Sequence, residues 1–193
     1  MNMRFKFIAK TFSGLEEVLC RELTALGAEN CQPMKRSVGF EGDFALLYRI
    51  NYFSFTALRV LWEMTSFSFH NNKQFYEALF DFEAERYLAP NGTLAVSVTM
   101  HDSIFKTPLF AAMLAKDAIC DRFRDRFGKR PSVNRESPDV QFHLHIFHDS
   151  ATLFLDSSGE SLHKRGYKVS NHPAPINEVL AAGMLQLSNW QAN

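Results

Sequence analysis

The stretch of residues 93–167 constrains the fold of this chain most strongly. Residues 93–100, TLAVSVTM, have the β-branched composition of a strand. Residues 107–127 have helical periodicity and are followed by Gly128, a residue type that commonly ends helices. Residues 140–146 alternate between apolar and polar side chains, and a second short strand is predicted at residues 151–156. The pattern predicts an α/β unit in which a strand, a long helix and a hairpin share one core.

The first 66 residues predict a smaller α+β unit. Three strands are predicted at residues 4–10, 37–41 and 57–65. Ser13 and Glu16 have the spacing of a capping box and Gly27 suits a helix C-terminus, so one helix is predicted between them. A second helix is predicted at residues 43–53. This order of short strands and helices is typical of a ferredoxin-like sandwich.

The charge of the chain is unevenly distributed. Lys and Arg total 21 and Asp and Glu total 21, so the chain as a whole is neutral. Residues 103–135 nevertheless hold eight basic and three acidic residues. A local excess of positive charge can attract phosphates even where the total is zero. The alternative is a solvated helix face that ion pairs neutralise, and the charges alone favour neither interpretation.

Lys116 is the least expected residue of the long helix. At a helical period it falls among apolar residues that we expect to face a sheet: Leu109, Ala112, Met113, Ile119, Cys120, Phe123 and Phe127. Such lysines commonly lay their aliphatic stem on apolar surface and keep the ammonium in water. The more specific interpretation is that the stripe ends at a cleft in which Lys116 meets phosphate.

Residues 161–167, SLHKRGY, place two cations and an aromatic ring around a glycine. This composition suits a backbone phosphate and a stacked base, and the alternative is a tight turn whose Tyr167 packs on a neighbouring domain. Pro175 then stands at the start of a predicted helix, residues 176–187, which is apolar on more than one side. Because this chain supplies no partner for that helix, we expect the 193 residues to be the front of a longer protein.

Other chemistries have weaker support in the sequence. Three cysteines stand far apart without CxxC spacing and no apolar run approaches membrane-spanning length, which together indicate a reducing, cytoplasmic setting. His143 and His145 share a strand face, but no Cys or carboxylate stands at ligand spacing, so no metal site is expected. Asp156, Glu160 and His163 lack a nucleophile, so no catalytic residue is predicted, and we expect these three to be structural or to contact RNA.

Four segments together resemble the THUMP-containing RNA methyltransferases. They are TPLFAAMLAKDAICDRF, RPSVNRESPDV, ATLFLDSSGESLHKRGY and PAPINEVLAAGMLQLSNW. Nearer the N-terminus, SGLEEVLCRELTALGA and SVGFEGD are similar to the ferredoxin-like domain that precedes THUMP in this family. The resemblance covers nearly the whole chain and is nearest to the amino-terminal part of the bacterial large-subunit rRNA guanine-N2 methyltransferases.

The resemblance implies an α+β protein with a ferredoxin-like domain at residues 1–66 and a THUMP domain at residues 67–158. Residues 159–193 would be a linker and the first helix of a Rossmann-like methyltransferase domain. The family's glycine-rich cofactor loop and N-P-P-Y-like motif are not found in this sequence, so we expect no cofactor binding and no methylation by these residues alone. S-adenosylmethionine is the cofactor expected for the full-length protein.

Structured RNA is the expected partner, with large-subunit rRNA as the first candidate. We expect ten residues to contact it: Lys106, Lys116, Arg122, Lys129, Arg130, Arg135, Lys164, Arg165, Tyr167 and Lys168. The alternative function is a THUMP RNA-binding module of another RNA-modifying enzyme, one that thiolates tRNA or forms pseudouridine, or a stand-alone adaptor. A protein-interaction scaffold that uses the ferredoxin-like sheet is a further alternative.

Overall fold

The computed structural model describes residues 3–166 and 175–188. The chain forms two compact units, one made of the described residues up to Trp62 and from Ser157 onward, the other of Glu63–Asp156. Within the described ranges, neither unit has a helix with both the length and the apolar composition needed to span a bilayer.

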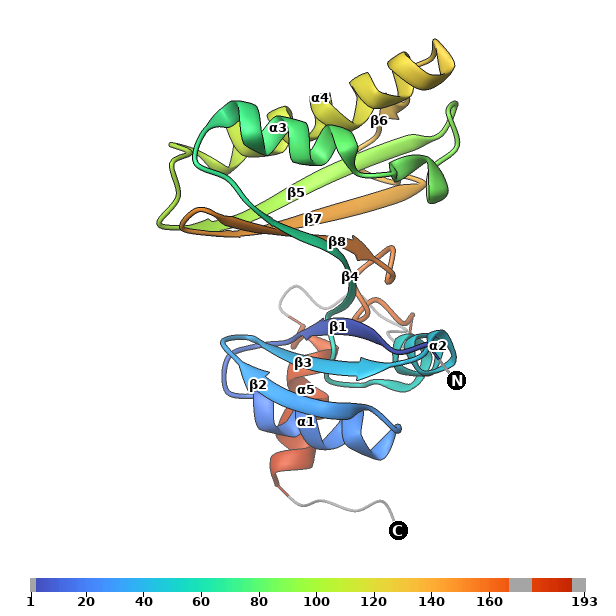
Figure 1. Ribbon diagram of the computed structural model, residues 1–193. Coiled ribbons are helices and arrows are strands. Elements are labelled where there is room, and N and C mark those ends of the chain that lie inside the picture. The colour runs from blue at the N-terminus through green and yellow to red at the C-terminus, as the bar shows by residue number, and fades with distance from the viewer. Residues whose placement is uncertain (1–2, 167–174, 189–193) are drawn as a thin grey trace. The chain divides into compact units, whose positions relative to one another are not determined.

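The first unit is a four-stranded antiparallel sheet covered by two helices. Its sheet order is β2-β3-β1-β4, from β1 (Phe5–Lys10), β2 (Glu29–Met34), β3 (Ser37–Gly42) and the first part of β4 (Arg59–Ser68). Phe7 on β1 lies opposite Phe40 on β3 and Trp62 on β4. Helices α1 (Glu16–Ala25) and α2 (Phe44–Phe53) pack against this sheet (Figure 1). The element order is that of the predicted ferredoxin-like sandwich.

The core of the first unit is built from helix residues at three- and four-residue spacing. Leu19 and Leu23 of α1 are buried, as are Leu47 and Ile50 of α2. They pack with sheet residues such as Val38 in one apolar cluster. Each fully buried side chain of this size stabilises the fold by about 1.5–3 kcal/mol relative to an exposed one.

One prediction for the first unit is wrong, and one of its strands was missed. Ser13 does not cap α1: the N-cap position is Leu15, without a side-chain bond, and the Glu16 carboxylate instead accepts the N–H groups of Gly14 and Arg36. Strand β2 was not predicted, because its side chains are mostly exposed and do not alternate. It contains Pro33, which an edge strand tolerates because one side of its backbone needs no partner.

The chain returns to the first unit after β8. The N–H of Ser157 donates to the carbonyl of Val60 at 3.0 Å, and that of Leu162 donates to Leu58 at 2.9 Å. Helix α5 (Glu178–Leu187) then packs against α1, where Val179 is buried next to Leu15. Asn177 caps α5, which starts at Glu178, so the predicted helical start at residue 176 after Pro175 is two residues too early.

The second unit is a mixed sheet with two helices on one face (Figure 1). Its sheet order is β4-β8-β7-β5-β6, from the end of β4, β5 (Thr93–His101), β6 (Ser132–Val133), β7 (Val140–Phe147) and β8 (Ser150–Asp156). Strand β5 is parallel to β6 and β7, and β7 forms the predicted antiparallel hairpin with β8. The helices are α3 (Asn72–Asp81) and α4 (Pro108–Phe127), with a short 3-10 turn, η1 (Ala84–Arg86), after α3.

Phenylalanine fills one end of the core of the second unit. The rings of Phe69, Phe75 and Phe105 are buried and lie with centroids 4.8–5.6 Å apart. Such ring pairs add about 0.5–1.5 kcal/mol each beyond the area that they bury. This core holds α3 and α4 on the sheet and so fixes the helix that carries two of the predicted RNA contacts, Lys116 and Arg122.

Candidate nucleic-acid interface

Helix α4 begins and ends where its sequence predicts. The Thr107 hydroxyl accepts a hydrogen bond from the N–H of Phe110, and Pro108 stands in the first turn, where no N–H is needed. Gly128 ends the helix in the left-handed conformation with φ of 65°, and its N–H donates to Arg124 at 2.9 Å. These caps fix the register in which the basic residues of α4 are presented.

The predicted apolar stripe of α4 is wrong in part. Ile119, Cys120 and Phe123 are buried, but three of its members are exposed: Leu109, Met113 and Phe127. The buried face instead runs through three alanines, Ala111, Ala115 and Ala118. Small side chains let α4 approach its neighbours closely, so the larger residues of its first turns lie outside the core.

A groove of about 260 Å³ lies beside this exposed part of α4. Helix α4 lines it with Leu109, Ala112, Met113 and Lys116, which recur every three or four residues and so share one side of the helix. The sheet side is lined by Ala95, Val96, Ser97, Val133, Arg135 and Gln141. The groove is therefore mainly apolar and carries two cations, and the predicted cleft next to Lys116 is present.

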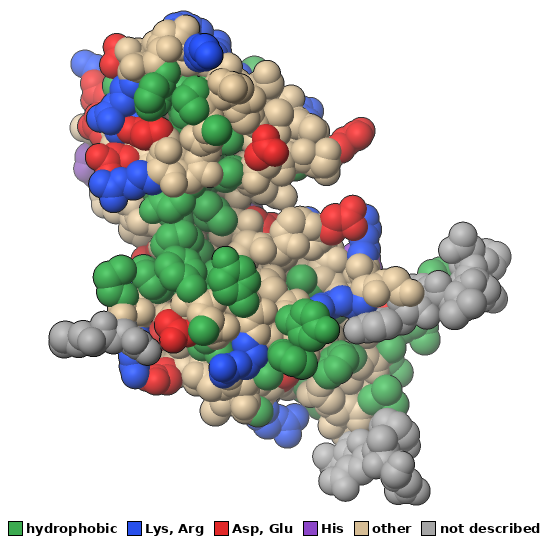
Figure 2. All heavy atoms as spheres, turned by 90° about the vertical axis from the view of Figure 1, so that its right-hand side faces the viewer, with side chains coloured by type: hydrophobic (Ala, Val, Ile, Leu, Met, Phe, Trp, Pro, Cys, Tyr) green, Lys and Arg blue, Asp and Glu red, His purple; other side chains and the backbone are tan. Residues whose placement is uncertain are grey.

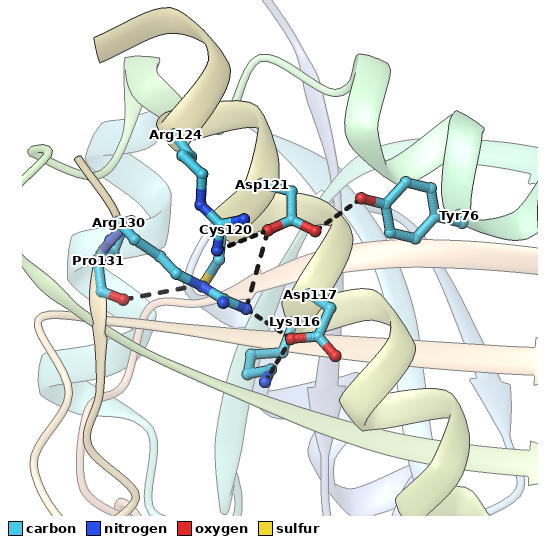
Figure 3. A network of polar contacts seen from close by, with 8 residues as sticks. All are labelled: Tyr76, Lys116, Asp117, Cys120, Asp121, Arg124, Arg130 and Pro131. Atoms are coloured by element: carbon cyan, nitrogen blue, oxygen red, sulfur yellow. Dashed lines mark hydrogen bonds and ion pairs between the residues drawn. The ribbon is translucent and has the colours of Figure 1, made fainter. Parts of the chain in front are cut away.

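Lys116 is only partly exposed and has an acidic partner. Its Nζ lies 2.6 Å from Oδ1 of Asp117, and Nη2 of Arg130 lies 2.6 Å from the same oxygen (Figure 3). The hydrogen bond from Lys116 holds the pKa of Asp117 below its ordinary value, and Arg130 acts in the same direction. The carboxylate therefore stays ionised and holds both cations at one place on α4.

Asp121 extends this network toward α3. It accepts a hydrogen bond from the Tyr76 hydroxyl at 2.8 Å, and Arg124 lies 3.4 Å from its other oxygen (Figure 3). Burial and the hydrogen bond to Asp121 raise the pKa of Tyr76 to about 12. Two acids, Asp117 and Asp121, thus neutralise much of the positive charge that the sequence concentrates on α4.

Arg122 is placed differently from the other predicted contacts. Its side chain is 6% exposed and donates to both oxygens of Glu85 and to the carbonyls of Phe80 and Asp81. The hydrogen bond with Glu85 raises the pKa of Arg122 above its ordinary value. Its donors face the protein interior, so we leave this residue out of the interface.

Three predicted contacts are exposed and have no acidic partner among the residues that the structure describes: Lys106, Lys129 and Arg135. Of these, Arg135 lines the groove with Lys116, and Lys106 lines a second pocket with Ile104 and Phe110. The structure therefore brings together Lys116, Arg130 and Arg135 and leaves Lys106 apart from them.

The remaining predicted contacts lie in the first unit or outside the described residues. Lys164 is exposed and lies 3.8 Å from Glu160. Arg165 donates to three carbonyls, those of Tyr52, Ser54 and Leu162, at 2.7–2.9 Å. Tyr167 and Lys168 are outside the described ranges.

The paired histidines are part of a hydrogen-bonded strand face. His143 on β7 shares hydrogen bonds with the hydroxyls of Ser97 and Thr99 on β5, at 2.9 and 3.1 Å. Across residues 3–166 and 175–188, no three His, Cys, Asp or Glu side chains are grouped so that they would hold a metal ion.

Sequence patterns did not identify the sheet side of the groove. Val133 belongs to β6, an edge strand of two residues, Arg135 follows it in sequence, and Gln141 shares β7 with the buried core. The signal available was Gln141, which lies on the polar face of the alternating strand, but the alternation does not specify which helix that face meets. The groove depends on the parallel pairing of β5 with β6 and β7, which local sequence does not encode.

Three family models match this chain. The model of the RlmL ferredoxin-like domain matches residues 6–61, that of the THUMP domain matches residues 69–156, and that of the RMKL-like methyltransferase domain matches residues 165–193. The predicted fold class, a ferredoxin-like domain followed by a THUMP domain, is confirmed.

Similar proteins are longer than this chain. A ribosomal RNA large subunit methyltransferase K/L from Syntrophotalea carbinolica is 41% identical over 190 residues, which are 98% of this chain and 27% of that protein. The crystal structure of a predicted N6-adenine-specific DNA methylase from Listeria monocytogenes matches 97% of this chain and 49% of its own, with 27% identity and a TM-score of 0.83.

A second solved structure, of a putative methyltransferase complexed with SAH, matches 98% of this chain and 50% of its own. Its sequence identity is 25% and its TM-score is 0.81. The chain therefore spans about a quarter of the Syntrophotalea protein and about half of each of the two solved proteins.

Proposed function

We infer that this chain, which belongs to the THUMP-containing RNA methyltransferase family, positions structured RNA for guanine-N2 methylation of large-subunit rRNA. The methyl transfer itself is assigned to the longer protein, since the relatives extend well beyond the length matched here. The domain boundaries that we propose are residues 1–66 and 67–158 for the two RNA-positioning domains and 159–193 for the linker and start of the catalytic domain.

The groove of the second unit is the observation that carries this proposal. Lys116 and Arg135 provide two cations among its lining residues, and Leu109, Met113 and Val133 provide exposed apolar surface. Cations suit backbone phosphates, while apolar surface suits the faces of bases or sugars. Arg130 is held next to Lys116 by Asp117 and adds to the positive side of the site.

Residues that bind RNA but take no part in the methyl transfer have a positioning role. The exocyclic amine of guanine is hard to reach inside a helix, so the target base has to leave the stack before it can react. Contacts with backbone phosphates would hold the flanking helix in register while that happens. S-adenosylmethionine would supply the methyl group in the longer protein. Among the described residues, the methyltransferase match consists mainly of α5, and the Asn177 side chain caps that helix. We therefore assign no described residue to the cofactor.

Fluorescence anisotropy tests this function. The chain would be titrated into a labelled rRNA hairpin, a tRNA and a single strand, each over a series of salt concentrations. We expect binding to structured RNA whose affinity falls as salt rises. Tighter binding to tRNA than to the rRNA hairpin would contradict the rRNA assignment, and weak binding to all three RNAs would contradict RNA positioning by this chain.

A further inference from the structure

Helix α2 of the first unit presents a row of exposed aromatic rings. Tyr48 and Tyr52 are each 74% exposed and stand four residues apart, so they share one side of the helix. Phe53 and Phe55 follow at 54% and 59% exposure. These four residues are the α2 aromatic cluster. Figure 2 looks onto the side that carries α2, where hydrophobic side chains are exposed beside Lys and Arg side chains.

The backbone beneath these rings is rigidly held. Both Glu22 oxygens accept hydrogen bonds from the segment after α2, including the N–H of Phe55 at 2.6 Å and that of Thr56 at 3.1 Å. From the other side, Arg165 donates to the carbonyls of Tyr52 and Ser54 at 2.8 and 2.9 Å. Ser54 is itself buried, between two exposed rings. The fold therefore fixes the chain here but leaves the aromatic side chains outside the core.

The same contacts bring positive charge to the cluster. Because Arg165 binds the end of α2, the backbone of the neighbouring Lys164 lies close to that end of the helix. Lys164 is exposed, and its 3.8 Å pair with Glu160 is between two well-exposed side chains, which makes it weak and easily exchanged. A cation beside flat, exposed rings is the combination used to bind single-stranded nucleic acid, with the backbone on the cation and the bases on the rings.

We propose that the α2 aromatic cluster, with Lys164, is a stacking site for unpaired RNA bases, distinct from the groove on α4. The proposal rests on the proposed function and names the part of the RNA that the first unit binds. The large apolar side chains that α2 exposes are all aromatic. Its aliphatic residues Leu46, Leu47 and Ile50 are buried on the other side. A rigid aromatic surface next to a cation favours bases, whereas an aliphatic surface would have favoured a protein helix.

The test compares two RNA hairpins that differ only in an unpaired extension, which carries 2-aminopurine. We expect the extension to strengthen binding and the 2-aminopurine fluorescence to fall as its base stacks. Tyr52→Leu and Phe53→Leu keep apolar side chains but remove the flat ring. We expect each to weaken binding of the extended hairpin by about fivefold or more, without changing binding of the blunt hairpin.

Two controls separate stacking from other effects. Tyr52→Phe keeps the ring and should retain affinity, and Phe147→Leu removes an exposed ring of the second unit and should have no effect. The proposal would be overturned if the two hairpins bound with equal affinity, or if Phe147→Leu weakened binding of the extended hairpin as much as Tyr52→Leu does. Either result would favour a protein partner for the cluster. If the blunt hairpin also fails to bind the unmodified chain, the proposed function itself fails.

Discussion

Arg122 on α4 donates from Nε and Nη2 to the two carboxylate oxygens of Glu85 on η1, each at 2.7 Å. Arg126, one turn further along α4, lies 2.7 Å from the same carboxylate. Two further bonds join Arg122 to the carbonyls of Phe80 and Asp81 at the end of α3. This planar, two-pronged arrangement is one that Arg forms and Lys cannot. It ties α4 to the turn that follows α3 and accounts for a cation inside the core.

Replacing Glu85 should destabilise the second unit. Glu85→Gln keeps the size of the side chain but leaves Arg122, which is 6% exposed on its side chain, without a charged partner. Removing one partner of a buried pair costs about 3 kcal/mol or more. We expect a lower midpoint in urea denaturation, whereas Arg86→Ala, which removes an exposed pair with Glu83, should change stability little.

The effect of Glu85→Gln should depend on pH. Hydrogen bonds from Arg122 lower the pKa of Glu85 from its ordinary value of 4.5. A carboxyl group with a lowered pKa in the folded state stabilises the fold fully above its unfolded value and loses that contribution as the pH falls through the folded value. The stability difference between the two proteins should therefore shrink below pH 4.5. A difference that stays constant through acid would show that the charge of Glu85 contributes nothing.

Loss of the groove cations should weaken RNA binding. Lys116→Gln and Arg135→Gln remove the charge but keep a polar side chain, and in the first variant Arg130 still neutralises Asp117. Each substitution should lower the slope of log affinity against log salt by about 1, and both together should weaken binding by about tenfold at moderate salt. Anisotropy over a salt series measures both quantities. Lys73→Gln is the matched control, since Lys73 is exposed on α3 and does not line the groove.

Sequence patterns predicted the elements that have strong local signals. Thr107 and Gly128 marked the ends of α4, and alternation over residues 140–146 marked β7. Strand β2 had no such signal, because its side chains are exposed and its pairing with β3 comes from the backbone. Periodicity also misplaced the buried face of α4. Large apolar residues such as Leu109 and Met113 were expected in the core, whereas the closely packed face of the helix runs through alanines.

The partners of the cations were less predictable than the elements. Arg122 and Arg130 stand eight residues apart on the same basic stretch, yet one is buried against Glu85 and the other is partly exposed with Asp117. Glu85 is 37 positions from Arg122 in sequence, so no local pattern joins them. Charge counts locate a basic region, but only the tertiary arrangement decides which of its cations face solvent.

Arg165 should act as a structural clamp of the first unit. Its guanidinium donates to three carbonyls at 2.7–2.9 Å, two of them at the C-terminal end of α2, where a cation also complements the helix dipole. Arg165→Ala should lower the free energy of unfolding by about 2 kcal/mol. Arg165→Lys should restore only part of this, because one ammonium cannot match the planar fork. Lys164→Ala, one residue away and exposed, should leave urea unfolding within about 0.5 kcal/mol of the unmodified chain.

Gly128 should be required for its backbone conformation and not for space. Its φ is 65°, while a Cβ added there would meet no atom within 4 Å. Any cost of Gly128→Ala therefore comes from the left-handed conformation, about 1 kcal/mol for an L-residue. Asn adopts this conformation more readily, so Gly128→Asn should cost less than Gly128→Ala in thermal or urea unfolding. Equal destabilisation of the two variants would contradict this explanation, because backbone strain predicts a difference between them.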